Sequence, residues 1–462
     1  MKPSQVLKEQ LLQLLPTGVS FDQDELKSFG TDWSRIPGNA LAVLFPRSTT
    51  DVVSILKWCS KEKVSVVPSG GRTGLVGGAV ARNQEIVLSL SRMNKIDEID
   101  PVARSVRVQA GAVTEAVHEK SSEFGLTWPI DLAAKGSSQI GGNLSTNAGG
   151  VRVVRYGSSR RWVTGIQAVL MSGDVLELNR GLEKNNTGYS LMQLLIGSEG
   201  TLAVITEATL KLSPCAKSSV VVFLAVESLE AIYDLFRKAR RQSFEVSAFE
   251  FLTQRCLKNV EVKLNVQSKL PNHYPFYVLL ELDSGEQSSD EVETWLPTLM
   301  GAGVIDGLVA KSSEEIKSVW MMREGITESI ALTGAVRKYD VSVPVPEMVQ
   351  FLKWVIVQSG HLDRKWELFL FGHFGDGSPH LNIVKKSGVT EDEFERDCEL
   401  FEVDLFGKLK SVGGSISSEH GVGLLKKEWV KHSRTPVELD IFRAIKKSFD
   451  PNNLLNPNKL IP

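Results

Sequence analysis

Apolar positions recur along the chain with helical spacing in some stretches and with strand spacing in many others. Val52, Ile55 and Cys59 fall on one face of a predicted helix. Thr49 or Thr50 can cap the N-terminus of this helix. Short strands are expected at residues 64–67, 85–90, 105–109, 162–171 and 201–212. Many short strands separated by glycine-rich turns, with few helices between them, indicate an α+β fold.

The pattern changes near Ser213 and Pro214. From there to about residue 346, predicted strands alternate with long amphipathic helices. The strands are expected at residues 220–226 and 276–282, and the helices at residues 229–241 and 313–332. A chain of 462 residues is also too long for one core. We therefore expect three segments, at residues 1–213, 214–420 and 421–462.

The composition excludes several classes of protein. With a formal net charge of -2, the chain lacks the basic surface that a nucleic-acid-binding protein needs. No apolar run approaches the roughly 18 residues of a membrane span, and the N-terminal residues lack a cleavage site, so we expect a cytoplasmic protein. The cysteines have no CxxC spacing, and we expect buried thiols of a reducing compartment. They are Cys59, Cys215, Cys256 and Cys398.

Three glycine-rich loops stand beside predicted strands. They are PSGGRTGLVGG at residues 68–78, IGGNLSTNAGG at 140–150 and GSEGTL at 197–202. Glycine permits positive φ and close approach to a ligand, and successive amide groups in such turns can bind a pyrophosphate. One such loop alone would more often be a surface turn. None has the GxGxxG pattern that opens a helix, so a nicotinamide-binding Rossmann domain is not expected.

Taken in order, these loops and further strings resemble the vanillyl-alcohol-oxidase-type (PCMH-type) FAD-binding family over nearly the whole chain. The strings are PIDLAAKG at residues 129–136, NLSTNAGG at 143–150, RYGS at 155–158 and NTGY at 186–189. Within that family the chain is most similar to the D-2-hydroxyglutarate dehydrogenases, with D-lactate and glycolate dehydrogenases as relatives. The resemblance implies an α+β protein in which a two-subdomain FAD-binding domain, residues 1–213 with the C-terminal return, carries an α+β substrate cap domain with an antiparallel sheet.

The resemblance also implies which residues hold FAD. Residues 68–78 would hold the pyrophosphate, and residues 131–150 and 197–205 would line the rest. The candidate residues are Pro68, Ser69, Gly70, Gly71, Arg72, Thr73, Gly74, Gly77, Gly78, Pro129, Asp131, Gly136, Ser137, Gly141, Gly142, Asn143, Thr146, Asn147, Gly149, Gly150, Glu199, Gly200, Ile205 and Asn456. Some members of the wider family attach FAD covalently through His or Cys. Since neither residue type occurs between Cys59 and His118, we expect non-covalent FAD.

A hairpin with two histidines is the main candidate for a metal site. Asp376 and Gly377 form a favoured two-residue turn. Placing them at the tip pairs His373 with His380 and puts both imidazoles on one face, with Cβ atoms about 5 Å apart. Asn382 shares that face. Two opposed histidines commonly bind a metal, whereas a single histidine would more often be incidental.

A polar loop, SSEHGVG at residues 417–423, offers an acid beside a histidine. Two histidines and one carboxylate make an open three-ligand site for zinc or a similar divalent ion. The resemblance assigns His373, His380 and Glu419 as the ligands, with zinc as the first candidate and manganese, cobalt and iron left open. His420, beside Glu419, is the candidate general base and a substrate contact.

Three polar residues form the candidate substrate end. Arg323 and Thr327 stand four apart on the predicted helix 313–332, and Lys338 follows in a predicted strand. The resemblance implies that they bind a second carboxylate, since buried cations and a hydroxyl are costly unless they meet an anion. Asn382 would orient the carboxylate or hydroxyl at the reacting end.

Together these features predict FAD-dependent oxidation of a D-2-hydroxy acid to the 2-oxo acid, with D-2-hydroxyglutarate as the first candidate substrate. Hydride would pass to the flavin N5 while a divalent metal polarises the substrate. One alternative is a dehydrogenase for D-lactate or another monocarboxylic hydroxy acid. Another, from a different class, is a flavoprotein subunit for electron transfer or assembly. The implied partners are the hydroxy acid and an electron acceptor such as an electron-transfer flavoprotein, and a homodimer is left open.

Overall fold

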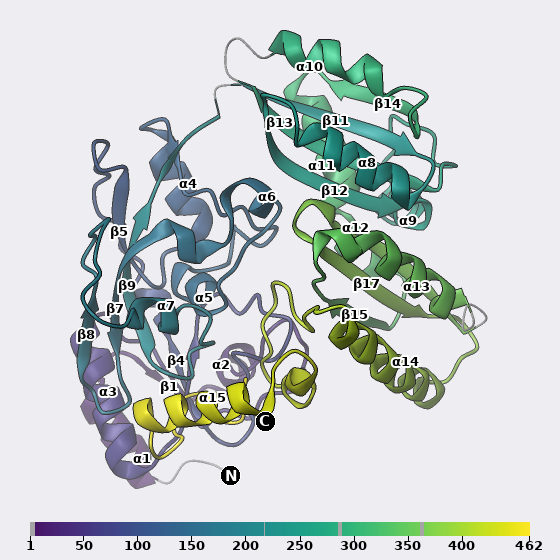
Figure 1. The fold of residues 1–462 in the computed structure, drawn as a ribbon. Helices are drawn as coiled ribbons and strands as arrows, with labels where there is room; N and C mark the ends of the chain where they lie inside the picture. Colours follow the sequence, from purple (N-terminus) through teal and green to yellow (C-terminus); the bar gives the residue numbers. More distant parts are fainter. Residues whose placement is uncertain (1–4, 217, 285–288, 361–364) are drawn as a thin grey trace. The chain divides into compact units, whose positions relative to one another are not determined.

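The computed structural model describes residues 5–216, 218–284, 289–360 and 365–462, which form two compact units (Figure 1). Unit 1 contains the residues up to Gly150, together with Ser158–Cys215 and Glu419–Pro462. Unit 2 contains Val151–Gly157 and Ala216–Ser418. The short stretch Val151–Gly157 therefore packs with unit 2, a feature that the expected segments did not include.

Unit 1 contains a mixed four-stranded sheet in the order β1-β2-β4-β3. Its strands are β1 (Val19–Ser20), β2 (Ala42–Leu44), β3 (Val66–Ser69) and β4 (Ile86–Ser89). β2, β4 and β3 are parallel, and β1 pairs antiparallel with β2. Both faces are apolar: Leu44 and Ile86 join the larger core with helix α3 (Thr49–Glu62), while Val43 and Val87 pack near helix α2 (Gln23–Phe29). Burial on both faces is what a parallel sheet requires.

A second sheet of unit 1 is antiparallel, in the order β5-β9-β7-β8. Its strands are β5 (Ser105–Gln109), β7 (Val163–Val169), β8 (Val175–Leu178) and β9 (Val204–Lys211). Two further strands, β6 (Leu126–Thr127) and β10 (Ser213–Pro214), form a separate antiparallel pair. The remaining α-helices of unit 1 are α1 (Gln5–Leu14), α4 (Thr114–Ser122), α5 (Ile140–Ser145), α7 (Leu191–Leu195) and α15 (Pro436–Phe449). One continuous hydrophobic core joins both four-stranded sheets.

The C-terminal residues complete the edge of the mixed sheet. Leu455 forms a parallel bridge to Val66. The Asn456 amide donates to the Val66 carbonyl at 2.7 Å, and the Val66 amide donates to the Leu454 carbonyl at 2.8 Å. Leu454 and Leu455 are buried in the same core as the sheet. The last residues of the chain are therefore part of the framework that carries the first glycine loop.

Unit 2 is built on a seven-stranded sheet in the order β14-β11-β13-β12-β16-β17-β15, with every pairing antiparallel. The strands are β11 (Ser218–Val226), β12 (Glu245–Thr253), β13 (Phe276–Ser284), β14 (Val304–Ala310), β15 (Val336–Asp340), β16 (Trp366–His373) and β17 (Ser378–Lys385). The α-helices are α6 (Val153–Tyr156), α8 (Leu229–Ala239), α9 (Gln254–Leu264), α10 (Ser289–Trp295), α11 (Ser313–Glu324), α12 (Ile326–Ala331), α13 (Met348–Gly360) and α14 (Glu391–Ser411).

Helices cover both faces of this sheet. Buried side chains of α9, α11 and α12 pack in one core with Phe223, Leu252 and Phe371 of the strands. On the opposite face, Phe236 of α8 packs on Phe249 with ring centroids 4.8 Å apart. Phe401 of α14 lies against Trp366 on that same opposite face. The face under α9, α11 and α12 also carries the polar residues described in the next subsection.

The structure confirms the α+β fold, with a two-sheet unit 1 and an antiparallel sheet in unit 2. The helix expected after Thr49 and the strand at residues 105–109 are present as α3 and β5. The single helix expected at residues 313–332 was wrong: α11 and α12 meet at Gly325, where a side chain would collide with Leu264. The expectation of buried cysteines was wrong for Cys215, which is exposed.

None of the helices in the described part of the chain combines the length and the apolar character that a membrane span requires.

We predict that Asp450→Ala destabilises unit 1 by about 3 kcal/mol, because it breaks a buried charge pair and strands backbone donors. The Asp450 carboxylate is 2% exposed and accepts from Lys446 Nζ at 2.6 Å and from the amides of Leu454 and Leu455 at 3.1 and 2.7 Å. Thermal unfolding followed by circular dichroism measures the loss. Asp440→Ala is the matched control, since its pair with Arg443 is exposed on the same helix and should contribute under about 1 kcal/mol. Equal losses in the two variants would contradict the prediction.

Candidate functional site

The glycine loops of unit 1 are packed backbone against backbone. A Cβ at Gly71 would lie 2.0 Å from the Ser137 carbonyl oxygen. Gly150 has φ +90°, and a Cβ there would lie 1.9 Å from the Asp131 carbonyl oxygen. Both positions therefore require glycine, because any side chain would force these loops apart. The first loop, the 131–138 stretch and the 141–150 loop thus form one wall of unit 1.

Two buried polar atoms in this wall lack hydrogen-bond partners within the part of the chain that the structure describes. They are Ser69 Oγ and Gln139 Oε1. The Gln139 oxygen lies 3.6 Å from the position of a Cβ on Gly70, and the space around Gly142 is open. Unsatisfied buried polar atoms are rare in proteins and usually mark a missing partner. The wall therefore fits a cofactor that supplies donors and acceptors, as FAD does.

The candidate FAD-binding residues all lie in unit 1. Asn456 links two of the loops, since its Nδ2 donates to the Gly78 carbonyl at 3.1 Å and to the Glu199 carbonyl at 2.7 Å. Lys459 Nζ in turn donates to Asn456 Oδ1 at 2.7 Å. Gln139 was not among the individually named candidates, although it lies within the 131–150 stretch that was expected to line FAD. Its position directly before the 140–150 loop was the available signal.

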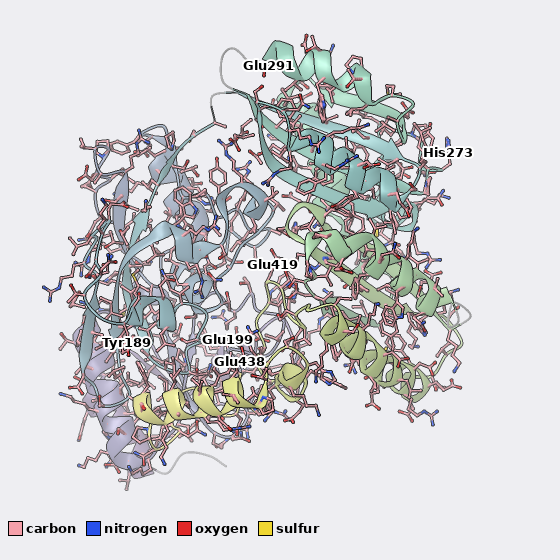
Figure 2. The ribbon with its side chains drawn as sticks, viewed as in Figure 1. Tyr189, Glu199, His273, Glu291, Glu419 and Glu438 are labelled. Carbon is pink, nitrogen blue, oxygen red and sulfur yellow. The ribbon has the colours of Figure 1, made fainter. Side chains whose placement is uncertain are left out.

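Glu199, labelled in Figure 2, uses its side chain to fix a backbone segment. Its two carboxylate oxygens accept from the amides of Val422 and Gly423 at 2.7 and 2.8 Å. Burial raises the pKa of Glu199, and these two hydrogen bonds oppose that rise. Glu419, also labelled in Figure 2, accepts from the Gly150 amide at 3.1 Å. The loop that carries Glu419 is therefore held at both ends by contacts within unit 1.

The histidine hairpin of unit 2 has a different register from the expected one. His373 pairs with Ser378, and His380 pairs with Phe371, so the predicted direct pairing of the two histidines was wrong. The connection has four residues, with a 3-10 turn at Phe374–Asp376 and a left-handed Gly377 at φ +80°. Phe374 is fully buried and packs on Phe251, with ring centroids 5.8 Å apart. This packing takes two more residues into the loop than an Asp-Gly turn needs.

The two imidazoles nevertheless lie together on one face of the sheet. Their ring centroids are 5.2 Å apart, with ring planes at 81°. A ring nitrogen of each lies within 4.8 Å of the other. In the neighbouring strand β15, Asp340 pairs with His380 and Lys338 pairs with Asn382. Because side chains alternate between faces, all five of these residues share the face that holds the histidines.

A buried carboxylate, which sequence reasoning missed, connects this group to helix α11. Glu250 of β12 is fully buried and pairs with His373 across the ladder. Its Oε1 lies 2.7 Å from His373 Nδ1, and its Oε2 accepts from Arg323 Nε at 2.7 Å. Burial alone would raise the pKa of Glu250, but the charges of His373 and Arg323 lower it below its usual value. An ionised carboxylate can only accept, so His373 donates to Glu250 from Nδ1.

The candidate substrate residues occupy different surroundings. Arg323 is 6% exposed, and its guanidinium also lies over the Phe371 ring at 5.0 Å from the centroid. Lys338 is half-buried beside Asn382 in the sheet. Thr327 is exposed near the start of α12. The structure thus brings Arg323 to the histidines through Glu250 and brings Lys338 to them through the sheet.

Glu419 and His420 follow directly in the chain from the last residue of unit 2. The Ser418 amide donates to Asp340 Oδ2 at 3.3 Å, and its hydroxyl hydrogen-bonds with the Ser378 hydroxyl. Asp340 is the strand partner of His380. Consecutive Cα atoms are about 3.8 Å apart. Ser418 touches the histidine hairpin at Ser378, and Glu419 is the next residue in the chain.

Comparisons with known proteins show what the chain is similar to. Residues 216–460 match the family model described as FAD linked oxidases, C-terminal domain, and residues 40–179 match the model described as FAD binding domain. The solved structure of an alkyldihydroxyacetonephosphate synthase superposes with a TM-score of 0.76, covering 100% of this chain and 87% of that chain at 17% identity. At that identity the likeness concerns the fold alone, and it agrees with the expected FAD-binding architecture.

Relatives in sequence are closer. A D-2-hydroxyglutarate dehydrogenase of Xanthomonas citri pv. viticola is 41% identical over 439 residues, which cover 94% of this chain and 92% of that protein. A protein of the same name from Stutzerimonas stutzeri is 38% identical and covers 96% of each chain. The mitochondrial D-2-hydroxyglutarate dehydrogenase of Bos taurus is 37% identical, covering 98% of this chain and 82% of its own length. The resemblance deduced from the glycine loops and strings is confirmed.

Proposed function

The chain belongs to the family of FAD-linked oxidases that includes the D-2-hydroxyglutarate dehydrogenases, and we propose that it oxidises D-2-hydroxyglutarate to 2-oxoglutarate. Membership of this family makes the chain an FAD-dependent hydroxy acid dehydrogenase. The observation that carries the substrate assignment is the polar face of the unit 2 sheet, where two imidazoles, an amide and a lysine stand side by side near a buried arginine. A second carboxylate on the substrate would bring an anion to this group of hydrogen-bond donors, whereas a monocarboxylic substrate would not.

Unit 1 would hold FAD without a covalent bond. The walls built by the loops at 68–78, 131–138 and 141–150 would bind it, and Ser69 Oγ and Gln139 Oε1 would gain partners. Bound there, FAD supplies the oxidant that accepts two electrons from the substrate carbon. Unit 1 residues contribute position and hydrogen bonds rather than redox chemistry.

A divalent cation, with zinc as the first candidate, would be held by His373, His380 and Glu419. Support comes from the two facing imidazoles, from the carboxylate behind His373 and from the chain connection between Ser418 and Glu419. Histidine ligands with a carboxylate behind them are typical of such centres. Held there, a divalent ion would supply Lewis-acid chemistry, favouring loss of the hydroxyl proton from the substrate.

The remaining residues would orient the substrate and move its proton. Arg323 keeps its Nη groups for the distal carboxylate while Nε binds Glu250, and Lys338 and Thr327 would add to that grip. Asn382 would hold the carboxylate or hydroxyl at the reacting end. His420 would take the hydroxyl proton as C2 loses its hydrogen with both electrons.

The reduced flavin must pass its electrons on, and we propose an electron-transfer flavoprotein as the acceptor. D-lactate, or another monocarboxylic D-2-hydroxy acid, is the competing substrate. The cytoplasmic location stays a prediction from the sequence, and the Bos taurus relative is named mitochondrial.

We predict that the wild-type enzyme prefers D-2-hydroxyglutarate over D-lactate by roughly a hundredfold in kcat/KM, because two charge-assisted contacts at about 1.5–3 kcal/mol each are lost with the shorter acid. Anaerobic flavin bleaching with each acid measures the preference. Lys338→Met should lower kcat/KM for the diacid about tenfold or more and leave D-lactate nearly unchanged. Lys385→Met is the control, because Lys385 lies at the far end of β17 and bonds the Val389 carbonyl. A wild-type preference for D-lactate would reject the diacid assignment.

We predict that chelation removes activity and leaves FAD bound, since the proposed ligands lie outside the glycine loops. His380→Ala should need excess metal to recover activity, whereas His273→Ala, which removes an exposed histidine of the same unit, should not. Elemental analysis measures the metal content, and flavin absorbance measures the FAD content. Active enzyme without a stoichiometric divalent ion would show that the ligand set is wrong.

We predict that His420→Ala lowers kcat by about 10²–10⁴-fold with metal and FAD contents intact, because a general base is lost. Anaerobic stopped-flow measurement of flavin reduction tests the chemical step directly. Reduction within a few-fold of the wild-type rate would remove His420 from this role.

A further inference from the structure

One buried carboxylate touches two groups that the proposed function places at opposite ends of the substrate. Glu250 Oε1 meets His373 Nδ1 at 2.7 Å, and Glu250 Oε2 meets Arg323 Nε at 2.7 Å. All three side chains are at most 7% exposed. Glu250 itself stands on the central strand β12, directly opposite His373. Because β12 is hydrogen-bonded to β13 and β16, the backbone of Glu250 cannot shift without breaking strand pairing.

The geometry leaves little freedom at either end. Each oxygen of Glu250 has its own strong donor, so rotation of the carboxylate would break both contacts together. Charge-assisted hydrogen bonds of this length are about twice as strong as neutral ones. The Arg323 guanidinium is further confined by the Phe371 ring beneath it. The imidazole and the guanidinium are thereby held at one separation.

We propose that Glu250 is a positioning residue that sets the distance between the metal-binding imidazole of His373 and the carboxylate-binding guanidinium of Arg323. In this role it determines which length of dicarboxylic hydroxy acid fits between them. The inference rests on the proposed function, which assigns those two roles. It adds a residue that contacts neither the substrate nor the metal.

The test is the isosteric variant Glu250→Gln, made in the full FAD-loaded chain. A glutamine presents one oxygen and one NH₂ group, so it can accept from only one of the two donors and loses the charge that both require. We expect the affinity for zinc, measured by competition with a chromophoric chelator, to fall about 10- to 100-fold. We also expect the kcat/KM preference for D-2-hydroxyglutarate over its four-carbon and six-carbon homologues, D-malate and D-2-hydroxyadipate, to fall about tenfold.

Glu281→Gln is the matched control. Glu281 is a second buried glutamate of the same sheet, and it pairs with Arg152 at 2.9 Å rather than with a histidine. Its loss removes the same charge from the same unit, so zinc affinity and chain-length preference should both stay at wild-type values. Glu250→Asp keeps the charge and should restore part of the zinc affinity.

The outcomes separate this inference from the proposed function. If wild-type protein binds zinc through His380 and Glu250→Gln binds it equally well, the positioning role is rejected and the proposed function survives. If zinc affinity falls but the chain-length preference does not, the coupling of the two ends is rejected. If wild-type protein binds no zinc through these histidines, the proposed metal ligands are wrong and the positioning role of Glu250 is rejected with them.

A second variant distinguishes a folding defect from the proposed loss of zinc affinity. Glu250→Gln leaves the Arg323 charge buried without its partner, which is strongly destabilising. The double variant Glu250→Gln/Arg323→Met removes both charges, and such replacements are often tolerated. Its zinc affinity should remain about 10- to 100-fold below that of Arg323→Met alone. Equal affinities in these two proteins would overturn the proposal.

Discussion

The sharing of one carboxylate between an arginine and a histidine is the interaction on which the chemistry of unit 2 depends. Glu250 is a charge inside a sheet whose neighbouring side chains are apolar, and it is tolerable there only because Arg323 and His373 both meet it. The same contacts orient the imidazole ring of His373 and the guanidinium of Arg323. A polar group of this kind adds order to a site while adding little to stability.

The hairpin shows why a sequence can predict which residues share a face and still miss which residues pair. The Asp-Gly rule assumes that the turn is decided locally, but burial of Phe374 between Phe236, Phe249 and Phe251 draws extra residues into the connection. The loop grew from two residues to four, so the register moved by an even number of positions. An even shift keeps every side chain on its face. The histidines therefore remained neighbours, although neither is the strand partner of the other.

Other parts of the site left weaker traces in the sequence. Glu250 stands in the run Ala248-Phe249-Glu250-Phe251-Leu252, where a single acid would be expected to face solvent. It is buried because Arg323 of α11 pairs with it, and the sequence does not show this contact. The glycine loops were easier to interpret, because close backbone approach at Gly71 and Gly150 excludes every other residue type. Gln139 carried no such restriction. A position that admits only glycine can thus be recognised from the sequence, whereas the partner of a buried charge is known only once the fold is known.

The order in which the units close has a consequence for synthesis of the chain. A polypeptide emerges from the ribosome from its N-terminus, and domains generally fold as they become complete. Unit 2 has all its residues once Ser418 has been made, but the mixed sheet of unit 1 waits for Leu455 to reach Val66. The glycine loops, although made early, therefore spend most of translation on an unfinished framework. Cofactor loading should be a late event in the life of each new molecule. A ribosome that stops between Ser418 and Leu455 would release a chain with a complete unit 2 and no finished site for FAD.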